Sequence, residues 1–248
     1  METIVANPVE PREDSLSPVY AMLRRPSLID YPGRLCRVLF ISGCNLRCFF
    51  CHNTDLIRPR DNYMDWNRLL RALISSREYW VDSVCISGGE PTLNPKLAEL
   101  IQRIRRLGFR IKLDTNGTRP EVLAAVLPQL DYIAMDYKAP LARYPEITGC
   151  QAFDPDALRR SLEIILTGGC EYELRTTVVE GWHTEGDMRS ICAELAGVRR
   201  FTLQGYVPPP EGNGDEPIRP AHRTPMKLLK AYYEICRSHF PETVLRGA

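Results

Sequence analysis

Three cysteines lie close together in the stretch GCNLRCFFCHN, a spacing typical of metal ligands. Cys44, Cys48 and Cys51 follow the pattern C-x3-C-x2-C, and the chain has no second pair of neighbouring cysteines that would complete a structural zinc site. His52 is a poor fourth zinc ligand, because its place beside Cys51 makes shared tetrahedral coordination awkward. In a 4Fe-4S cluster each iron takes one ligand beyond the sulfides, so three thiolates would leave one iron open. The spacing therefore favours an iron–sulfur cluster with one corner left for a co-substrate.

The other cysteines occur singly: Cys36, Cys85, Cys150, Cys170, Cys192 and Cys236. Cys36 and Cys85 fall within strand-like runs, and Cys192 and Cys236 fall within helical patterns. Free cysteine behaves as a small buried hydrophobe, so we expect these four in the core. An odd total of nine cysteines in a chain of this size does not suggest a disulfide framework.

Glycine-rich and charged motifs follow the next strand-like segments. Gly88, Gly89 and Glu90 occur in SGGEP, where paired glycines let the backbone approach a ligand closely. Asp136 and Lys138 occur in MDYK, where strand alternation sends both side chains to one side. A carboxylate beside an ammonium group suits an amino acid zwitterion; the alternative is a surface ion pair worth under about 1 kcal/mol.

Further polar residues lie in or after strand-like runs. Asp114 ends one run and begins DTNG, and Gln204 ends the last run in LQGY. Arg175 lies inside an apolar run, so it needs a partner at the rim or in the interior of the fold. His183 follows the same run, and we expect it at the surface rather than as a catalytic base.

Six strand-like segments alternate with helical patterns, and these elements must position the motifs. The expected strands cover residues 35–41, 83–86, 110–113, 132–135, 173–179 and 201–204. The expected helices cover residues 65–77, 120–130, 155–166, 185–195 and 225–240, with one more between a cap at Asn94 and a stop at Gly108. This alternation predicts an α/β fold, a partial (β/α)6 barrel whose parallel sheet carries outer helices. The carboxyl ends of the strands share one rim, where the motifs should converge.

Composition argues against a nucleic-acid-binding, membrane-spanning or secreted protein. The chain has 248 residues, 44% apolar and 25% charged, with a net charge of +1, which gives no reason to expect nucleic acid or an anionic membrane as a partner. No apolar run reaches the ~18 residues of a membrane span, and the acidic start lacks the features of a signal peptide. We therefore expect a cytoplasmic protein, with residues 1–24 as a loosely ordered arm and residues 25–248 as one barrel domain.

The cysteine motif, with the aromatic Phe50 before its last cysteine, resembles that of the radical S-adenosylmethionine (SAM) superfamily. The likeness extends to SLIDYPG, CHN, SGGEPTL, DTNG, MDYKAP and RTTVV, which in this order resemble the activating enzymes of glycyl radical proteins. Within that group the chain looks most like the anaerobic ribonucleotide reductase activating proteins, and the resemblance covers about residues 27–240.

The resemblance implies a 4Fe-4S cluster on Cys44, Cys48 and Cys51, whose open iron is chelated by the amino and carboxylate groups of SAM. Reduction by a donor such as flavodoxin or ferredoxin would cleave SAM to methionine and a 5′-deoxyadenosyl radical. That radical would take hydrogen from a glycine of a partner glycyl radical enzyme, the anaerobic ribonucleotide reductase. No catalytic side chain is expected beyond the cluster and SAM.

By the same resemblance, residues at the rim would bind SAM. Residues 88–90 and Asp136 would bind its amino group, and Lys138 its carboxylate. Asp114 would contact the cofactor or a nearby monovalent cation. The remaining expected contacts are Arg175 with SAM or the substrate backbone, Gln204 near the ribose where some activating enzymes carry histidine, and Phe50 on the adenine or, equally, in the core.

Two other functions are compatible with the cysteine motif. The chain could be a radical SAM enzyme that modifies a small molecule such as a deazapurine precursor, although DYPG and CHN are less expected there. It could also be a non-catalytic iron–sulfur or zinc module that senses iron or oxygen. Release of 5′-deoxyadenosine would separate the enzymes from the sensor.

Overall fold

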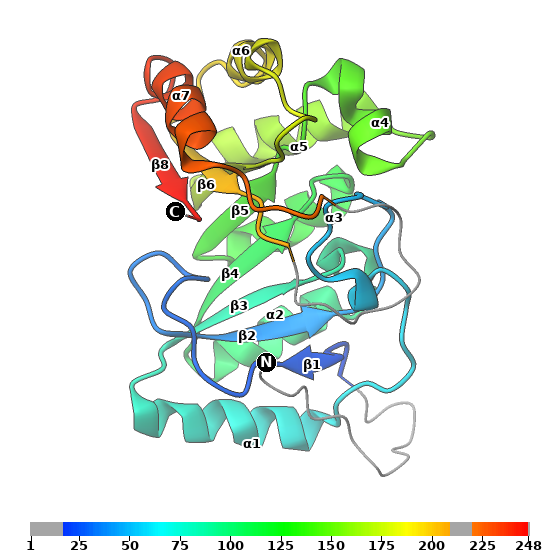
Figure 1. The fold of residues 1–248 in the computed structure, drawn as a ribbon. Coiled ribbons are helices and arrows are strands. Elements are labelled where there is room, and N and C mark those ends of the chain that lie inside the picture. The colour runs from blue at the N-terminus through cyan, green and yellow to red at the C-terminus, as the bar shows by residue number, and fades with distance from the viewer. Residues whose placement is uncertain (1–16, 209–219, 248) are drawn as a thin grey trace.

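One open, mostly parallel sheet forms the centre of the protein. The computed structural model describes residues 17–208 and 220–247, and its sheet has strand order β1 to β8, with β2 to β8 parallel and β1 antiparallel to β2 (Figure 1). The strands are β1 (Ala21–Met22), β2 (Cys36–Ile41), β3 (Ser83–Gly88), β4 (Arg110–Thr115), β5 (Tyr132–Asp136), β6 (Glu171–Val178), β7 (Arg200–Gly205) and β8 (Glu242–Arg246). Within the described residues β1 does not pair with β8, so the barrel is not closed. The expected α/β fold with a partial barrel and outer helices is confirmed.

Strands β2 to β7 correspond to the six expected strands, and β1 and β8 were not anticipated. β1 lies within the segment expected to be a loose arm: Val19 beside it is fully buried, and its Ala21 pairs with Phe40 of β2. Residues 17–24 of that arm are thus packed on the sheet, whereas residues 1–16 lie outside the described part of the chain. At the other edge, β8 pairs with β7 from Glu242 to Arg246.

The six expected helices follow the strands, with shifts at their ends, and the short helix α4 was not anticipated. They are α1 (Trp66–Ser76), α2 (Leu97–Arg106), α3 (Pro120–Val126), α4 (Tyr144–Thr148), α5 (Pro155–Thr167), α6 (Glu185–Glu194) and α7 (Met226–Arg237). Figure 1 shows α1 at one end of the molecule and α6 and α7 at the other. Among the described residues, no helix combines the length and apolar character needed to cross a membrane.

The cap of α2 differs from the expectation. Lys96, not Asn94, is the N-cap residue, and the Asn94 side chain instead accepts a hydrogen bond from Lys96 N at 2.9 Å in the turn before the helix. The expected stop at Gly108 is confirmed, with φ +77° and its N–H donating to Arg105 O at 2.8 Å. α3 ends early, because Pro128 has no N–H to continue it, and a 3-10 turn over Leu127–Gln129 follows.

The two faces of the sheet have different chemistry. Outward side chains such as Leu39, Ile86 and Leu113 join the large core beneath the helices. At the amino ends of the strands, the inner face carries a small second core of Tyr31, Cys36, Val38, Cys85 and Tyr132. Towards the carboxyl ends, the inner positions become charged. Alternation along each strand therefore places a polar group of residues inside the rim of the barrel.

Candidate functional site

The loop that carries the three clustered cysteines is held against the sheet by main-chain hydrogen bonds. Gly43 N donates to Leu56 O at 2.8 Å and Cys44 N to Ile57 O at 2.9 Å, which closes the loop on itself. Arg47 N donates to Thr148 O at 2.8 Å and ties the middle of the loop to the end of α4. The loop follows β2 directly, so the thiols lie at the rim where sequence reasoning placed them.

Gly88 and Gly89 allow this loop to approach the end of β3. Gly88 has φ +134°, and a Cβ there would lie 2.1 Å from Ile41 O. A Cβ on Gly89 would lie 2.2 Å from Gly43 O, and the next residue, Glu90, donates its N–H to that same oxygen at 2.8 Å. Any side chain at either glycine would force the two loops apart, so both glycines are required by packing independently of any ligand.

The thiols suit a cluster as ligands. Cys48 is 9% exposed, and burial raises the pKa of its thiol to about 12, against the opposing charge of Lys138. Burial also raises the pKa of Cys44, whose sulfur accepts a hydrogen bond from Leu46 N at 3.4 Å. Metal loading would have to displace these protons. Hydrogen bonds to a ligating sulfur and a low-dielectric surrounding are the features by which proteins tune iron–sulfur clusters.

The thiols do not converge on a single point. Among the described residues, no three His, Cys, Asp or Glu side chains are grouped closely enough to hold one metal ion. A cubane cluster places each thiolate on a different iron, so its ligands need not meet at one centre. Three thiols from one short loop fit that requirement, and they lie close enough that Cys51 raises the pKa of both Cys44 and Cys48.

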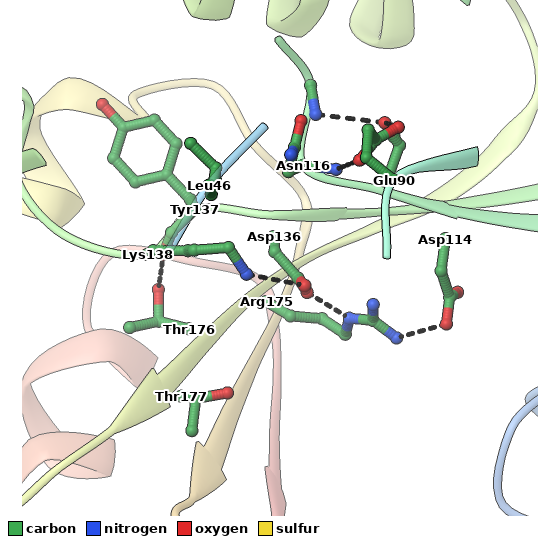
Figure 2. Close-up of polar contacts among 12 residues, drawn as sticks. Leu46, Glu90, Asp114, Asn116, Asp136, Tyr137, Lys138, Arg175, Thr176 and Thr177 are labelled. Atoms are coloured by element: carbon green, nitrogen blue, oxygen red, sulfur yellow. Dashed lines mark hydrogen bonds and ion pairs between the residues drawn. The ribbon is translucent and has the colours of Figure 1, made fainter. Parts of the chain in front are cut away.

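A ladder of alternating charges crosses the inner face of β4, β5 and β6 (Figure 2). Arg175 links two carboxylates, with Nη1 3.3 Å from Asp114 Oδ2 and Nε 2.8 Å from Asp136 Oδ1. Lys138 Nζ lies 3.1 Å from Asp136 Oδ2 at one end, and Lys112 pairs with Asp114 at the other. The structure thus brings together Asp114, Asp136, Lys138 and Arg175, which were all predicted, and supplies a partner for the buried arginine.

The ladder keeps its carboxylates ionised. Burial alone would raise the pKa of Asp136, but the charges of Arg175 and Lys138 outweigh it and hold that pKa well below the usual range. The pKa of Asp114 is lowered by Arg175 and Lys112 against the same effect of burial. Lys112, which is 1% exposed, was missed by the sequence analysis. Its spacing of two residues from Asp114 in one strand was the available signal, since the same alternation was used for Asp136 and Lys138.

Glu90 does not face the ladder. Its carboxylate is fully buried and accepts hydrogen bonds from Thr92 N at 3.1 Å, Thr92 Oγ1 at 2.5 Å and Thr115 Oγ1 at 2.8 Å. It also accepts from Asn116 N at 2.6 Å, and Figure 2 shows Asn116 beside it. Burial raises its pKa, and these four bonds act against that rise. The side chain therefore braces the loop after β3 against the loop after β4, and a ligand would meet residues 88–90 through their main chain.

The same brace reaches the cysteine loop. Asn116 Nδ2 donates to Asn45 Oδ1 at 3.0 Å, and Asn45 Nδ2 donates to Thr118 Oγ1 at 2.9 Å. Asn45 lies between Cys44 and Cys48, so the loops after β2, β3 and β4 are joined by side-chain hydrogen bonds. Asn116, the asparagine of DTNG, therefore joins two loops by hydrogen bonds in addition to its place in a turn.

Phe50 is 6% exposed and packs edge-to-face on Phe49 at 5.1 Å between ring centroids. Its ring lies in the core, which is one of the two places expected for it. His183 is also buried, at 3% exposure, so the expected surface position is wrong. Its ring lies 6.3 Å from that of Phe50 and contacts the main chain of Lys138. A histidine just after a strand gave no sequence signal for this position.

Gln204 borders a cavity of about 540 Å³ that opens beside the ladder. The residues that line it include Leu28, Ile29 and Asp30 on one side and Arg175, Gln204 and Arg246 on the other. Arg246, on β8, reaches Glu173 of β6 at 2.9 Å. Leu28 and Ile29 are 74% and 81% exposed, so the cavity has an apolar lip at the open side of the barrel.

Known proteins share both the sequence and the architecture. A Methanocaldococcus jannaschii protein provisionally named as a glycyl-radical enzyme activating enzyme is 28% identical over 226 residues, which cover 89% of this chain and 92% of that one. A domain of pyruvate-formate lyase-activating enzyme from Bacteroides vulgatus aligns with 66% of this chain and 99% of its own, at a TM-score of 0.51 and 18% identity. Streptococcus suis SuiB bound to its precursor peptide SuiA aligns with 85% of this chain and 48% of its own, at a TM-score of 0.66 and 16% identity.

The sequence model of the radical SAM superfamily matches residues 38–189, more than half of the chain. The matched segment begins in β2 and ends in α6, so it contains the cysteine loop, residues 88–90 and the whole charge ladder. The three cysteines at the rim of the open barrel lie within this segment. The chain therefore belongs to the radical SAM superfamily.

Proposed function

We propose that this protein is an activating enzyme that installs a glycyl radical on a partner enzyme, the anaerobic ribonucleotide reductase. The observation that carries the proposal is the match with the M. jannaschii activating enzyme, which extends over 89% of this chain and 92% of that one. Membership of the superfamily implies a 4Fe-4S cluster and SAM. The glycyl radical partner and the residue roles below are inferences from the site.

Cys44, Cys48 and Cys51 would hold the cluster, and the Leu46 N–H would donate to the Cys44 sulfur there as it does now. When bound, the cluster and SAM would supply the radical chemistry, in which one electron and SAM give methionine and a 5′-deoxyadenosyl radical able to remove a hydrogen atom from a glycine Cα. The electron comes from a low-potential donor protein such as flavodoxin or ferredoxin, in a reducing cytoplasm. The protein's own contribution is to bind, orient and exclude water.

The charge ladder would orient SAM. Asp136 and Lys138 form an acid–base pair next to the cysteine loop, which suits the amino and carboxylate groups of an amino acid. The main chain of residues 88–90 would add acceptors for the amino group. Asp114 would contact the cofactor or a monovalent cation from the far side of Arg175, and Gln204 would lie near the ribose.

The cavity beside the ladder supports a protein substrate. It is open at the side of the barrel, and its lip of Leu28 and Ile29 is exposed enough to contact an extended segment of another chain. Arg175 belongs to both the cavity and the ladder, so a segment that enters there would reach the SAM-binding side chains. A glycine is the one residue whose Cα such a segment can present without a side chain in the way.

Anaerobic reconstitution with iron, sulfide, dithionite and SAM tests the proposal, with the candidate reductase from the same genome as substrate. We expect 5′-deoxyadenosine in solution and a glycyl doublet in the electron paramagnetic resonance spectrum of the partner. If 5′-deoxyadenosine forms but no doublet appears with any glycyl radical protein of that genome, a small-molecule substrate such as a deazapurine precursor is supported instead. If the cluster assembles and 5′-deoxyadenosine never forms, the protein is a sensor module.

A further inference from the structure

The main chain of the Asp136–Lys138 segment has all three of its carbonyl groups bound by buried side chains. Tyr144 OH lies 3.3 Å from Asp136 O, Thr176 Oγ1 donates to Tyr137 O at 2.5 Å, and the His183 ring lies 2.9 Å from Lys138 O. Tyr144 and Thr176 are fully buried, and His183 is 3% exposed. Three separate elements therefore fix the backbone from which Asp136 and Lys138 project.

His183 can serve only as a donor towards Lys138. Val179 N–H donates to His183 Nδ1 at 3.1 Å, so Nδ1 is the unprotonated nitrogen of the ring. The proton is therefore on Nε2, which points at Lys138 O from 2.9 Å. The main chain of the histidine is itself held, because Tyr232 OH donates to His183 O at 2.8 Å. The imidazole is a neutral link between the loop after β6 and Lys138.

This link matters because a lysine is hard to position. Its ammonium group sits on a flexible four-carbon stem, so its location depends on a fixed main chain and a partner at its tip. At Lys138 the tip is held by Asp136, and among the described residues the side chain bound to its carbonyl group is His183. If a ligand carboxylate replaced the Asp136 contact, the position of the lysine would depend on its main chain, which His183 holds at the carbonyl group and Tyr144 OH holds by accepting from the N–H at 3.2 Å.

We propose that His183 is a positioning residue that holds Lys138 in place for the carboxylate of SAM. The inference rests on the proposed function, since it assigns Lys138 to SAM. His183 lies far along the chain from the cysteine loop, and its ring acts on Lys138 through the carbonyl group of that residue.

Two substitutions separate the two hydrogen bonds of the ring. Glutamine extends far enough to keep a donor at the position of Nε2, so His183→Gln should retain the bond to Lys138. Asparagine ends near the position of Nδ1, so His183→Asn should keep the acceptor for Val179 N–H and lose the contact with Lys138. The matched control is His239→Leu, because His239 is exposed and bonds only near the end of α7.

The test is the dissociation constant of SAM from the anaerobically reconstituted protein, measured by equilibrium dialysis, with iron content and thermal midpoint recorded for each variant. We expect His183→Asn to weaken SAM binding about tenfold at unchanged iron content, and His183→Gln and His239→Leu to change it less than about threefold. Lys138→Met should weaken binding too, and adding His183→Asn to it should weaken it no further, since the two residues act in series.

Equal SAM affinity in His183→Asn and His183→Gln would overturn the inference, as would additive effects of His183→Asn and Lys138→Met. Failure of the underlying function has a different signature: a sensor would bind no SAM in the wild-type protein, and a small-molecule enzyme would bind SAM but form no glycyl doublet on a partner. If His183→Asn does not fold, hydrogen exchange at the 137–139 amides of His183→Gln still tests the inference, because these amides report how firmly the main chain around Lys138 is held. Protection equal to that of the wild type would show that the link to Lys138 O is kept and would support the inference. A loss of protection of more than about tenfold would contradict the inference.

Discussion

Arg175 donates from Nε to Asp136 Oδ1 at 2.8 Å, and the two residues are direct register partners on the adjacent strands β6 and β5. Cross-strand partners have their side chains side by side on one face of the sheet, so the ion pair follows from the register itself. Arg175 also reaches Asp114 on β4, so one guanidinium bridges two carboxylates inside the barrel, each of which also pairs with a lysine. Strands β4, β5 and β6 are thus held together by Asp114, Asp136 and Arg175, which are among the residues proposed to bind SAM.

Removing the arginine should cost stability, because two buried carboxylates would lose their shared partner. For Arg175→Met we expect the free energy of unfolding to fall by about 3 kcal/mol, the lower range for breaking a buried ion pair. Urea unfolding of the metal-free protein measures it. The matched control is Arg159→Met, whose pair with Asp156 is 61% and 70% exposed and should cost under about 1 kcal/mol. Equal losses in the two variants would contradict the buried ladder.

The buried position of Glu90 leads to a second prediction. Glutamine at this position keeps the shape but replaces one acceptor oxygen by an amide group, which would face donors on Thr92 or Asn116. We expect Glu90→Gln to lower the free energy of unfolding by about 1–3 kcal/mol, whereas Glu121→Gln on the exposed face of α3 should have little effect. Iron uptake should fall as well, because Glu90 and Asn116 brace the cysteine loop. An unchanged urea midpoint for Glu90→Gln would show that the carboxylate is not the brace.

Much of the fold could be predicted because β2 to β7 are apolar runs followed by turn residues and helical stripes. The strand 35–41 and the helix stop at Gly108 are examples in which local pattern and tertiary packing agree. β8 was missed because ETVLR is short and follows a helix directly, so only pairing with β7 makes it a strand. β1 has two residues, too few for any periodicity.

The site was predictable where a single strand carries the signal and unpredictable where two elements must meet. Asp136 and Lys138 could be placed together because they are two residues apart where the chain leaves the end of β5. The partners of Glu90 lie on a different loop at Thr115 and Asn116, and nothing in the local sequence says that the carboxylate turns inward. His183 was misplaced for the same reason, since its burial depends on contacts with Val179 and Lys138 rather than on a pattern.

The cysteine assignment leads to a third prediction. Cys48→Ala should remove the cluster and all SAM cleavage while leaving the barrel folded, because it deletes one sulfur from a well-packed position. Iron and sulfide content should fall to near zero after anaerobic reconstitution, with a circular dichroism spectrum like that of the wild type. Cys170→Ala, half-buried near Leu130 O and distant in sequence from the loop, is the control and should keep its iron. Full cleavage by Cys48→Ala would contradict the cluster assignment.

The last prediction concerns pH and follows from the burial of His183. Burial lowers the pKa of this histidine below its usual value, although the contact with Lys138 O and the charge of Asp187 oppose the shift, and Arg143 adds to it. In the unfolded chain the imidazole has a pKa of about 6.5. Between that value and the lower folded pKa, the unfolded state binds the proton and the folded state does not, so the free energy of unfolding must fall as the pH drops.

Above pH ~6.5 both states are neutral and the contribution of His183 is complete. We therefore expect the urea midpoint of the metal-free protein to fall more steeply from pH 7 to pH 5 in the wild type than in His183→Gln, which has nothing to protonate there. The comparison uses the slopes, because the substitution also changes stability at every pH. His239→Leu should keep the wild-type slope, since His239 is exposed. Parallel slopes for the wild type and His183→Gln would mean that the ring is protonated equally easily in the folded and unfolded chains, which a histidine locked between Val179 and Lys138 cannot be.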